Sequence, residues 1–149
     1  MSTHAIVVKS RHVSPLHVLG TQVRFLCEGA STGSAWSLME VTLPQGSGPP
    51  PHVHDWDEAY VVLEGEVAFS VGDQRIDAVA GDFIYTPGGL AHGFSGASAE
   101  PARLLIFDAP AHAGTFFKRV DREVKALPDD LSKVLDIGAE TGIRFLQPA

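Results

Sequence analysis

The sequence predicts an all-β barrel or sandwich followed by short C-terminal helices. Up to Phe107, short alternating segments bounded by Gly, Pro, Asp or Ser recur roughly every 8 to 12 residues, a spacing typical of antiparallel strands. Beyond Pro110 the apolar period lengthens to about four residues, which is typical of helix. A chain of 149 residues can bury its own core without disulfides. We therefore expect one domain over residues 1–149, with a barrel core at about 21–110 and a helical appendage at 111–149.

The first clear strands are expected at residues 21–29 and 34–46. A Gly/Ser-rich turn separates them, so they should form a hairpin. In the second strand both sets of alternating positions contain apolar residues, and the inward face stays undecided. Cys27, the only cysteine, has no intramolecular disulfide partner and is interpreted as a small buried residue. Residues 1–20 should form a strand and a loop over the barrel or over a partner subunit.

The central part of the chain contains a rigid loop and then a series of strands. Pro49 to Pro51 remove three backbone donors and fix φ, so we expect a stiff extended loop there and not an internal strand. Residues 58–82 predict three strands, and residues 102–110 predict the last strand of the barrel. The turns of this region are placed at Glu64–Gly65, Gly72–Asp73 and Gly81.

The C-terminal part predicts two short helices. Apolar residues recur at every fourth position from Phe116 to Val124, Thr115 is the candidate N-cap, and Pro128 should end this helix. A second helix opens after Pro128 and should end near Gly138. The tail from 141 to 149 should add an edge strand or stay extended.

Metal-ligating residues concentrate in the segment that follows the prolines. His52 and His54 are two apart in a predicted strand, so they point to one face, and Glu58 and Tyr60 have the same parity. Two imidazoles and a carboxylate that converge in this way predict a metal site. His92 follows a Pro-Gly-Gly turn, far enough along the chain for a strand out and a strand back. A closed barrel could bring His92 to the other ligands.

These residues resemble the two sequence motifs of the cupin family. Residues 46–65 reproduce the first motif, G-x5-H-x-H-x3-E-x6-G, at every specified position. Residues 81–96 reproduce the second, G-x5-P-x-G-x2-H-x3-N, except that Gly96 replaces the Asn. That Asn is not a metal ligand in the family, so the exchange bears on local turn packing. The resemblance implies a double-stranded β-helix (jelly-roll) barrel. It also implies the metal ligands His52, His54, Glu58 and His92.

Over roughly residues 25–147 the chain is similar to small single-domain bacterial cupins described as quercetin 2,3-dioxygenase-like. In the dioxygenases of that family the metal binds the deprotonated hydroxyl of a flavonol, dioxygen cleaves the heterocycle, and the motif glutamate assists as base. The resemblance thus implies a catalytic role for Glu58, as both ligand and proton acceptor. It implies a small phenolic or enolisable substrate, with dioxygen as co-substrate, and a homodimer built on the outer barrel face and the terminal segments.

The expected ligand set leaves the identity of the metal open. Three neutral imidazoles and one carboxylate suit a divalent Fe, Mn, Ni, Co or Zn ion. An octahedral ion with four protein ligands keeps two open positions, whereas a tetrahedral zinc would be filled and mainly structural. Tyr60, Phe69 and Phe94 are the candidate pocket residues, and apolar walls of this kind suit a flat hydrophobic ligand. Each of these aromatic residues could equally belong to the barrel core.

Three other functional interpretations stay open at this point. A metal-dependent isomerase or cyclase would use the same ligands as a Lewis-acid site without dioxygen. A non-catalytic module would bind a small molecule without turnover. A barrel whose histidines are satisfied without metal is the plainest alternative. Anaerobic turnover would separate the isomerase or cyclase from the oxygenase.

Charge and hydropathy exclude several classes of partner. The net charge is −7 and no cluster of Lys and Arg occurs, which excludes nucleic acid and anionic membrane surfaces as partners. No apolar run approaches the length of a membrane span. The N-terminal residues lack the pattern of a secretory signal, and we therefore expect a cytoplasmic protein.

Overall fold

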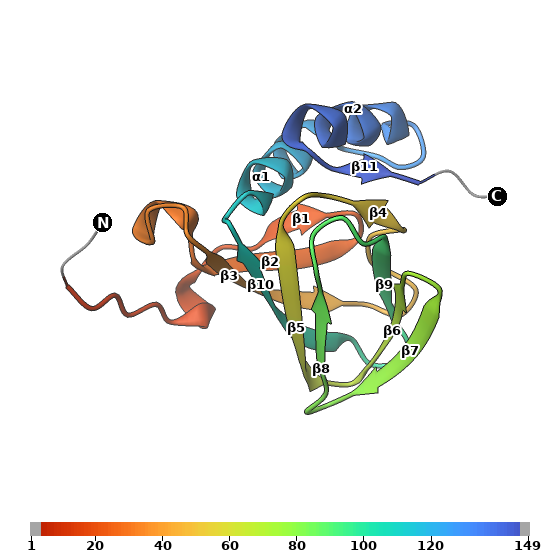
Figure 1. Cartoon of the computed structure of the whole chain (residues 1–149), viewed down its shortest axis with the longest axis horizontal. Helices are drawn as coiled ribbons and strands as arrows, with labels where there is room; N and C mark the ends of the chain where they lie inside the picture. Colours follow the sequence, from red (N-terminus) through yellow and green to blue (C-terminus); the bar gives the residue numbers. More distant parts are fainter. Residues whose placement is uncertain (1–3, 147–149) are drawn as a thin grey trace.

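A computed structural model of the chain describes residues 4–146 and confirms the all-β jelly-roll architecture with short C-terminal helices (Figure 1). Two antiparallel sheets face each other and enclose the core. In spatial order, the six-stranded sheet contains β1 (Leu16–Val18), β2 (Thr21–Cys27), β3 (Ser37–Leu43), β10 (Ala102–Ala109), β5 (Asp57–Glu64) and β8 (Phe83–Thr86). The five-stranded sheet contains β11 (Arg144–Phe145), β4 (His52–Val53), β9 (His92–Gly96), β6 (Glu66–Val71) and β7 (Gln74–Val79).

Helical segments lie outside the two sheets. The helices α1 (Ala113–Glu123) and α2 (Leu131–Thr141) lie together with β11 over one end of the barrel (Figure 1). Single 3-10 turns occupy Ser10–His12 and Gly29–Ser31. Within residues 4–146, no helix is long and apolar enough to cross a membrane.

Strict alternation along the strands builds the core. In β3 the side chains of Met39, Val41 and Leu43 are buried, which settles the inward face that the sequence left undecided. Their neighbours Glu40 and Thr42 point outward, because a buried carboxylate or hydroxyl without a partner is costly. The same alternation in β5 directs Glu58 and Tyr60 into the barrel, and His92 at the start of β9 is also buried.

Gly96 is required by the close approach of a neighbouring chain segment. A Cβ atom at this position would lie 2.5 Å from the carbonyl oxygen of Pro44 and 2.7 Å from that of Leu43. The backbone of Gly96 accepts a hydrogen bond from Gly46 N (2.8 Å) and donates one to Ser47 O (3.0 Å). An Asn side chain does not fit between these backbones, so the departure from the second motif has a steric cause.

The start of α1 differs from the prediction. The helix begins at Ala113, two residues before Thr115, and Thr115 does not cap it. Instead Oδ2 of Asp108, on β10, accepts hydrogen bonds from the backbone N–H groups of His112 and Ala113, each at 3.1 Å. A carboxylate at a helix N-terminus satisfies donors that have no partner within the helix. The cap comes from the preceding strand, and a search for a polar residue at the helix start therefore missed it.

The predicted helix ends were also wrong. The first helix ends at Glu123, before Pro128, and the second continues through Gly138. Gly138 is buried inside α2, whereas Gly142 adopts φ 87° and terminates the helix in the left-handed conformation. The tail forms β11, an edge strand, as one of the two predicted alternatives; residues 147–149 lie outside the described part.

We predict that restoring the motif residue at position 96 destabilises the barrel. Gly96→Asn should lower the free energy of unfolding by about 1–3 kcal/mol, because the new side chain is forced against two backbone carbonyls. Urea denaturation would measure this. The control is Gly114→Ala in α1, where the added Cβ meets only Phe25 at an ordinary 3.8 Å. The control should be neutral or stabilising, by at most about 1 kcal/mol; a stable Gly96→Asn variant would contradict the steric explanation.

Candidate metal centre

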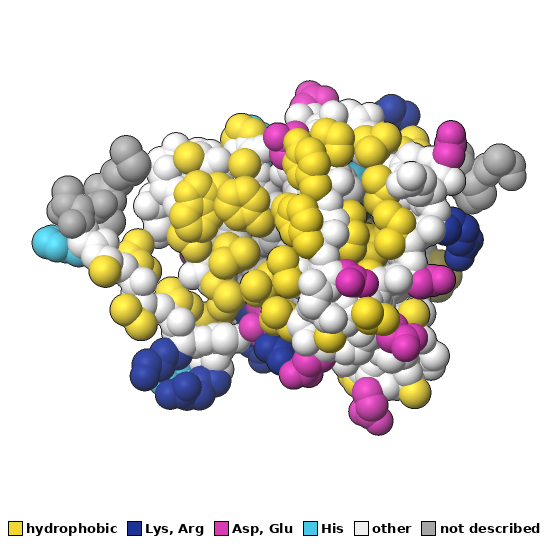
Figure 2. Space-filling view, turned by 60° about the horizontal axis from the view of Figure 1, so that its bottom comes forward, with side chains coloured by type: hydrophobic (Ala, Val, Ile, Leu, Met, Phe, Trp, Pro, Cys, Tyr) yellow, Lys and Arg dark blue, Asp and Glu magenta, His cyan; other side chains and the backbone are white. Residues whose placement is uncertain are grey.

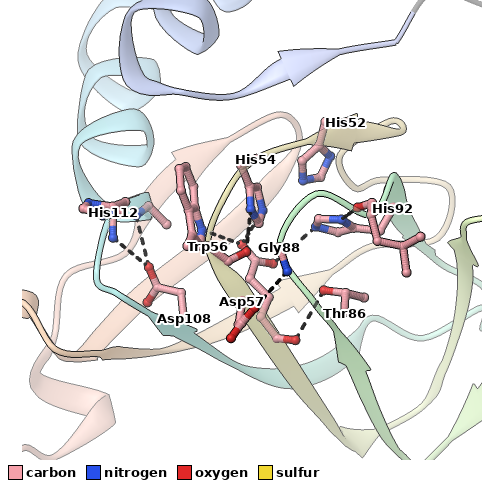
Figure 3. A network of polar contacts seen from close by, with 12 residues as sticks. His52, His54, Trp56, Asp57, Thr86, Gly88, His92, Asp108 and His112 are labelled. Carbon is pink, nitrogen blue, oxygen red and sulfur yellow. Dashed lines mark hydrogen bonds and ion pairs between the residues drawn. The ribbon is translucent and has the colours of Figure 1, made fainter.

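Three histidines converge from two neighbouring strands of the five-stranded sheet. His52 on β4 is the register partner of His92 on β9, and His54 follows directly after β4. All three are buried, and one ring nitrogen of each lies within 4.8 Å of the others. Figure 3 shows the three imidazoles pointing toward one another. The structure thus brings the three sequence-predicted histidines together.

Backbone hydrogen bonds fix the orientation of each imidazole. Nδ1 lies 2.8, 3.0 and 2.9 Å from a main-chain carbonyl oxygen in His52, His54 and His92, respectively. Because a carbonyl can only accept, Nδ1 must carry the hydrogen, and Nε2 presents its lone pair to the centre. In the neutral rings, Nε2 of His54 and Nε2 of His92 are, among the described side chains, buried without a hydrogen-bond partner, and each can donate to Glu58 only when its ring is protonated. Convergent imidazole lone pairs that accept no hydrogen bond fit a divalent metal ion.

Glu58, from β5 of the opposite sheet, places its carboxylate beside the imidazoles. Oε1 lies 3.0 Å from Nε2 of His54, and Oε2 lies 3.6 Å from Nε2 of His92. Two donors hold the carboxylate: the Tyr60 hydroxyl donates to Oε2, and Trp56 Nε1 donates to Oε1 at 3.4 Å. The carboxylate is therefore close enough to join the three histidines as a fourth ligand.

Electrostatic coupling shifts the pKa values of the site in opposite directions. Burial alone would raise the pKa of Glu58, but hydrogen bonding and charge from the neighbouring imidazoles lower it below its ordinary range. Burial would lower the pKa of His92, but the contact with Glu58 outweighs burial and raises that pKa. Burial, together with nearby His92, lowers the pKa of His52 to about 4. In the absence of metal, Glu58 thus favours the charged form of His92, and His92 favours the charged form of Glu58.

Trp56 is a site residue that the sequence analysis missed. Its indole ring stacks on the imidazole of His54, with ring centroids 4.0 Å apart and planes only 3° apart. Its other edge faces the ring of His112, 5.5 Å away, at the start of α1. Trp56 has the same parity as His54 and Glu58, so the alternation that identified those residues also indicated Trp56.

A narrow apolar cavity of about 40 Å³ adjoins the imidazoles and the carboxylate. Of the predicted pocket residues, Phe94 lines this cavity. Tyr60 and Phe69 lie in the core next to it, with their ring centroids 5.3 and 5.5 Å from that of Phe94. The far wall comes from the C-terminal elements, which the sequence did not connect with the site. These residues are Ala113, Phe116, Phe117, Ile143 and Phe145.

We predict that metal affinity decreases as the pH decreases, because an imidazole must be neutral before its Nε2 can bind the ion. Contact with Glu58 raises the pKa of His92, so His92 takes up a proton at a higher pH than an ordinary histidine, whereas burial lowers the pKa of His52 to about 4. The apparent affinity for Co(II) should fall about tenfold or more between about pH 7.5 and about pH 5.5, measured by competition with a chelating dye.

The controls for this titration separate the site from other histidines. The double variant His52→Ala/His92→Ala should bind no Co(II) at either pH. His17→Ala removes an exposed imidazole outside the cluster and should behave like the unchanged protein. An affinity that stays constant over this pH range would contradict binding by neutral imidazoles.

Three comparisons with known proteins point to the same family. A family model described as Cupin domain matches residues 39–108. An uncharacterised protein of Streptomyces coelicolor is 32% identical over 68 residues, 46% of this chain and 65% of the relative. Quercetin 2,3-dioxygenase of Bacillus subtilis is 29% identical over 80 residues, 52% of this chain and 24% of that protein. The alignments thus span less than two thirds of the length of these two relatives.

A third relative matches over nearly the whole chain. Polyketide synthase CurC of Streptomyces cyaneus is 23% identical over 138 residues, which is 91% of this chain and 90% of that protein.

Solved structures share the fold at low sequence identity. A predicted oxalate decarboxylase from Thermotoga maritima superposes with a TM-score of 0.66 at 22% identity, over 70% of this chain and 99% of the other. The polyketide cyclase RemF from Streptomyces resistomycificus gives 0.63 at 23% identity, over 71% and 80%. The family model over residues 39–108, the relatives and the fold agree, and together they support the cupin superfamily for this chain.

Proposed function

We propose that this cupin is a metal-dependent dioxygenase that acts on a small phenolic or enolisable compound. The observation that carries the proposal is the combination of three imidazole lone pairs and one buried carboxylate at the edge of an otherwise apolar cavity. The similarity to quercetin 2,3-dioxygenase over about half of this chain supports the same reaction class.

Four residues would hold the metal in this proposal: His52, His54, His92 and Glu58. A divalent Fe, Mn, Ni, Co or Zn ion bound there would act as a Lewis acid toward a substrate oxygen. The apolar walls would exclude water and would align the flat body of the substrate. The tyrosine and tryptophan donors would keep the carboxylate in place.

Glu58 is the proposed base. The low pKa of its carboxyl group depends on hydrogen bonds from His54 and His92. An imidazole that uses Nε2 as a metal ligand cannot donate from that atom, so in the loaded site these bonds are lost. The positive charge of the bound ion would then keep the carboxylate ionised. Glu58 could accept the proton of a substrate hydroxyl placed next to it.

The composition of the cavity wall limits the substrate class. Among the described residues, no Lys or Arg lines the cavity. A phosphate or a second carboxylate on the substrate would therefore be buried without a counterion, which is costly. This favours a neutral, flat compound with its hydroxyl at the histidine end and disfavours oxalate-like dianions.

A metal-dependent cyclase is the second candidate, and a specific observation favours it. The similarity to CurC extends over 91% of this chain, and RemF, a polyketide cyclase, has the same fold. Proton removal by Glu58 would start either reaction, because cyclisation also begins at an enolisable carbon or a phenol. The two reactions differ in their need for dioxygen.

The test is turnover with and without dioxygen. Protein loaded with Fe(II), Mn(II), Ni(II) or Co(II) should consume dioxygen with a hydroxyflavone or a related enolisable phenol, measured with an oxygen electrode. Glu58→Gln should lower the rate per bound metal about 100-fold or more, because it removes the base. Glu64→Gln changes an exposed carboxylate on the same strand and serves as the matched control.

The outcomes separate the candidates. Conversion under anaerobic conditions would favour the cyclase. Binding without conversion would favour a small-molecule-binding cupin. No dioxygen uptake with any such compound and any of the four metals would refute the dioxygenase.

We further propose that the protein forms a homodimer through the outer face of the six-stranded sheet. Trp36 and Phe107 stack on this face, with centroids 5.7 Å apart, and both are more than one third exposed. Phe83 and Tyr85 on β8 are 64% and 51% exposed. Figure 2 shows a face on which hydrophobic side chains form a broad surface with charged groups toward its margins. A two-fold axis lets such a surface cover itself.

The dimer is tested by charge insertion. Phe107→Glu should shift the mass measured by light scattering from a dimer to a monomer, because a carboxylate would be buried in the interface. Leu131→Glu places the same charge on an exposed position of α2 and should leave the mass unchanged. A monomeric unchanged protein, or a dimeric Phe107→Glu variant, would refute this interface.

The proposal includes a cytoplasmic location. Cys27 is partly buried and lacks an intramolecular disulfide partner, so the fold does not depend on an oxidising compartment. The single domain over residues 1–149 likewise stays a prediction.

A further inference from the structure

A short C-terminal strand closes the cavity above the histidines. Phe145 on β11 is the register partner of His52 on β4, and its ring centroid lies 5.8 Å from that imidazole. On its other side the ring lies 6.0 Å from Phe116 of α1. The strand that carries Phe145 therefore forms both the edge of the sheet and a wall of the cavity.

The cavity as it stands is too small for the substrate of the proposed function. Its volume is about 40 Å³. An apolar cavity that holds one benzene ring needs about 150 Å³. A ring compound can therefore reach the histidines only if one wall moves.

Most of the walls are firmly anchored. Apart from the two-residue β4, which has one register pair with β9, the barrel walls are strands within longer hydrogen-bonded ladders. Helix α1 is held by the Asp108 cap, by Asp121 Oδ1, which accepts from His17 N at 2.7 Å, and by an ion pair between Lys118 and Glu28. These contacts join the helix to β10, to β1 and to the segment after β2.

The wall formed by β11 is the weakest. The strand has only two residues, lies at a sheet edge, and is extended by a single bond from Leu146 N to Pro51 O (3.0 Å). Gly142 precedes it in the left-handed conformation, is exposed, and separates the strand from α2. A rotation at Gly142 would move Ile143 and Phe145 together, with loss of the bond from Ile143 N to Gly138 O (2.8 Å) at the end of α2.

We propose that Phe145 is the specificity-determining residue of this cupin. Separation of β11 from β4 admits a ring-sized ligand to the histidines, and the side chain at position 145 sets the size of the ligand that enters without this movement. Small ligands bind with the strand in place. The inference takes its ligand class from the proposed function, but its test does not depend on turnover.

The test compares a large and a small ligand on Co(II)-loaded protein by stopped-flow absorbance. 3-Hydroxyflavone is the ring-sized probe, and azide is the small probe. Phe145→Ala should accelerate association of 3-hydroxyflavone about tenfold or more and change azide association less than about twofold. Phe145→Leu should give an intermediate rate. Val79→Ala truncates an exposed side chain on β7 that does not line the cavity, and it should match the unchanged protein.

A reversible cross-link provides a second, opposite test. Arg144 and Val53 are direct register partners on β11 and β4, so Val53→Cys/Arg144→Cys can join the strands by a disulfide. The oxidised protein should bind 3-hydroxyflavone at least about tenfold more slowly, with recovery after reduction, while azide binding stays the same. Metal content and melting temperature verify that each variant is folded and loaded.

The outcomes distinguish this inference from the proposed function. Equal rates for 3-hydroxyflavone in the Phe145→Ala, cross-linked and unchanged proteins would overturn it, as would failure of all three to bind the flavone while they bind azide. If the association rates change as expected, the role of Phe145 is supported even where no compound is converted. In that case only the proposed enzyme activity is refuted.

Discussion

The hydrogen bond from Nδ1 of each histidine to a backbone carbonyl is the interaction on which the centre depends. Once Nδ1 donates to the main chain, Nε2 has no hydrogen and its lone pair points inward. The carbonyl acceptor for His52 belongs to Pro50, within the three prolines whose backbone is already rigid. The orientation of the three imidazoles is therefore set by the main chain and does not require an ion.

Two buried carboxylates on adjacent strands have different roles because different hydrogen-bond donors surround them. Glu58 and Asp108 are register partners on β5 and β10. Asp108 accepts from two backbone N–H groups and from the Ser37 hydroxyl, yet burial raises its pKa, and it serves as a helix cap. Glu58 faces imidazoles and remains ionised. Trp56 connects the two regions, since it contacts His54 on one side and the start of α1 on the other.

The C-terminal elements turn an open barrel end into an enclosed site. Helix α1 contributes aromatic walls and is tied to the barrel, whereas β11 adds only a two-residue ladder beside His52. Enclosure strengthens electrostatic interactions at the centre because it lowers the local dielectric. The same enclosure restricts access, and the strand that closes the site has only two residues and lies at the edge of its sheet. Within the C-terminal appendage, α1 thus protects the site, whereas β11 controls access to it.

Local patterns in the sequence determined the barrel strands, their turns and the ligand candidates. Alternation predicted that His52, His54 and Glu58 converge, because strand geometry has a period of two. The chain leaves the strand after Val53, however, and Glu58 lies on the opposite sheet, so their convergence also depends on how the two sheets face each other. Alternation also indicated Trp56. The tertiary structure alone decided the helix limits and the cavity. A cap from Asp108, the burial of Gly138 and the position of Phe145 over His52 arise from segments that meet only after folding. Such contacts depend on long-range packing, which no local periodicity encodes.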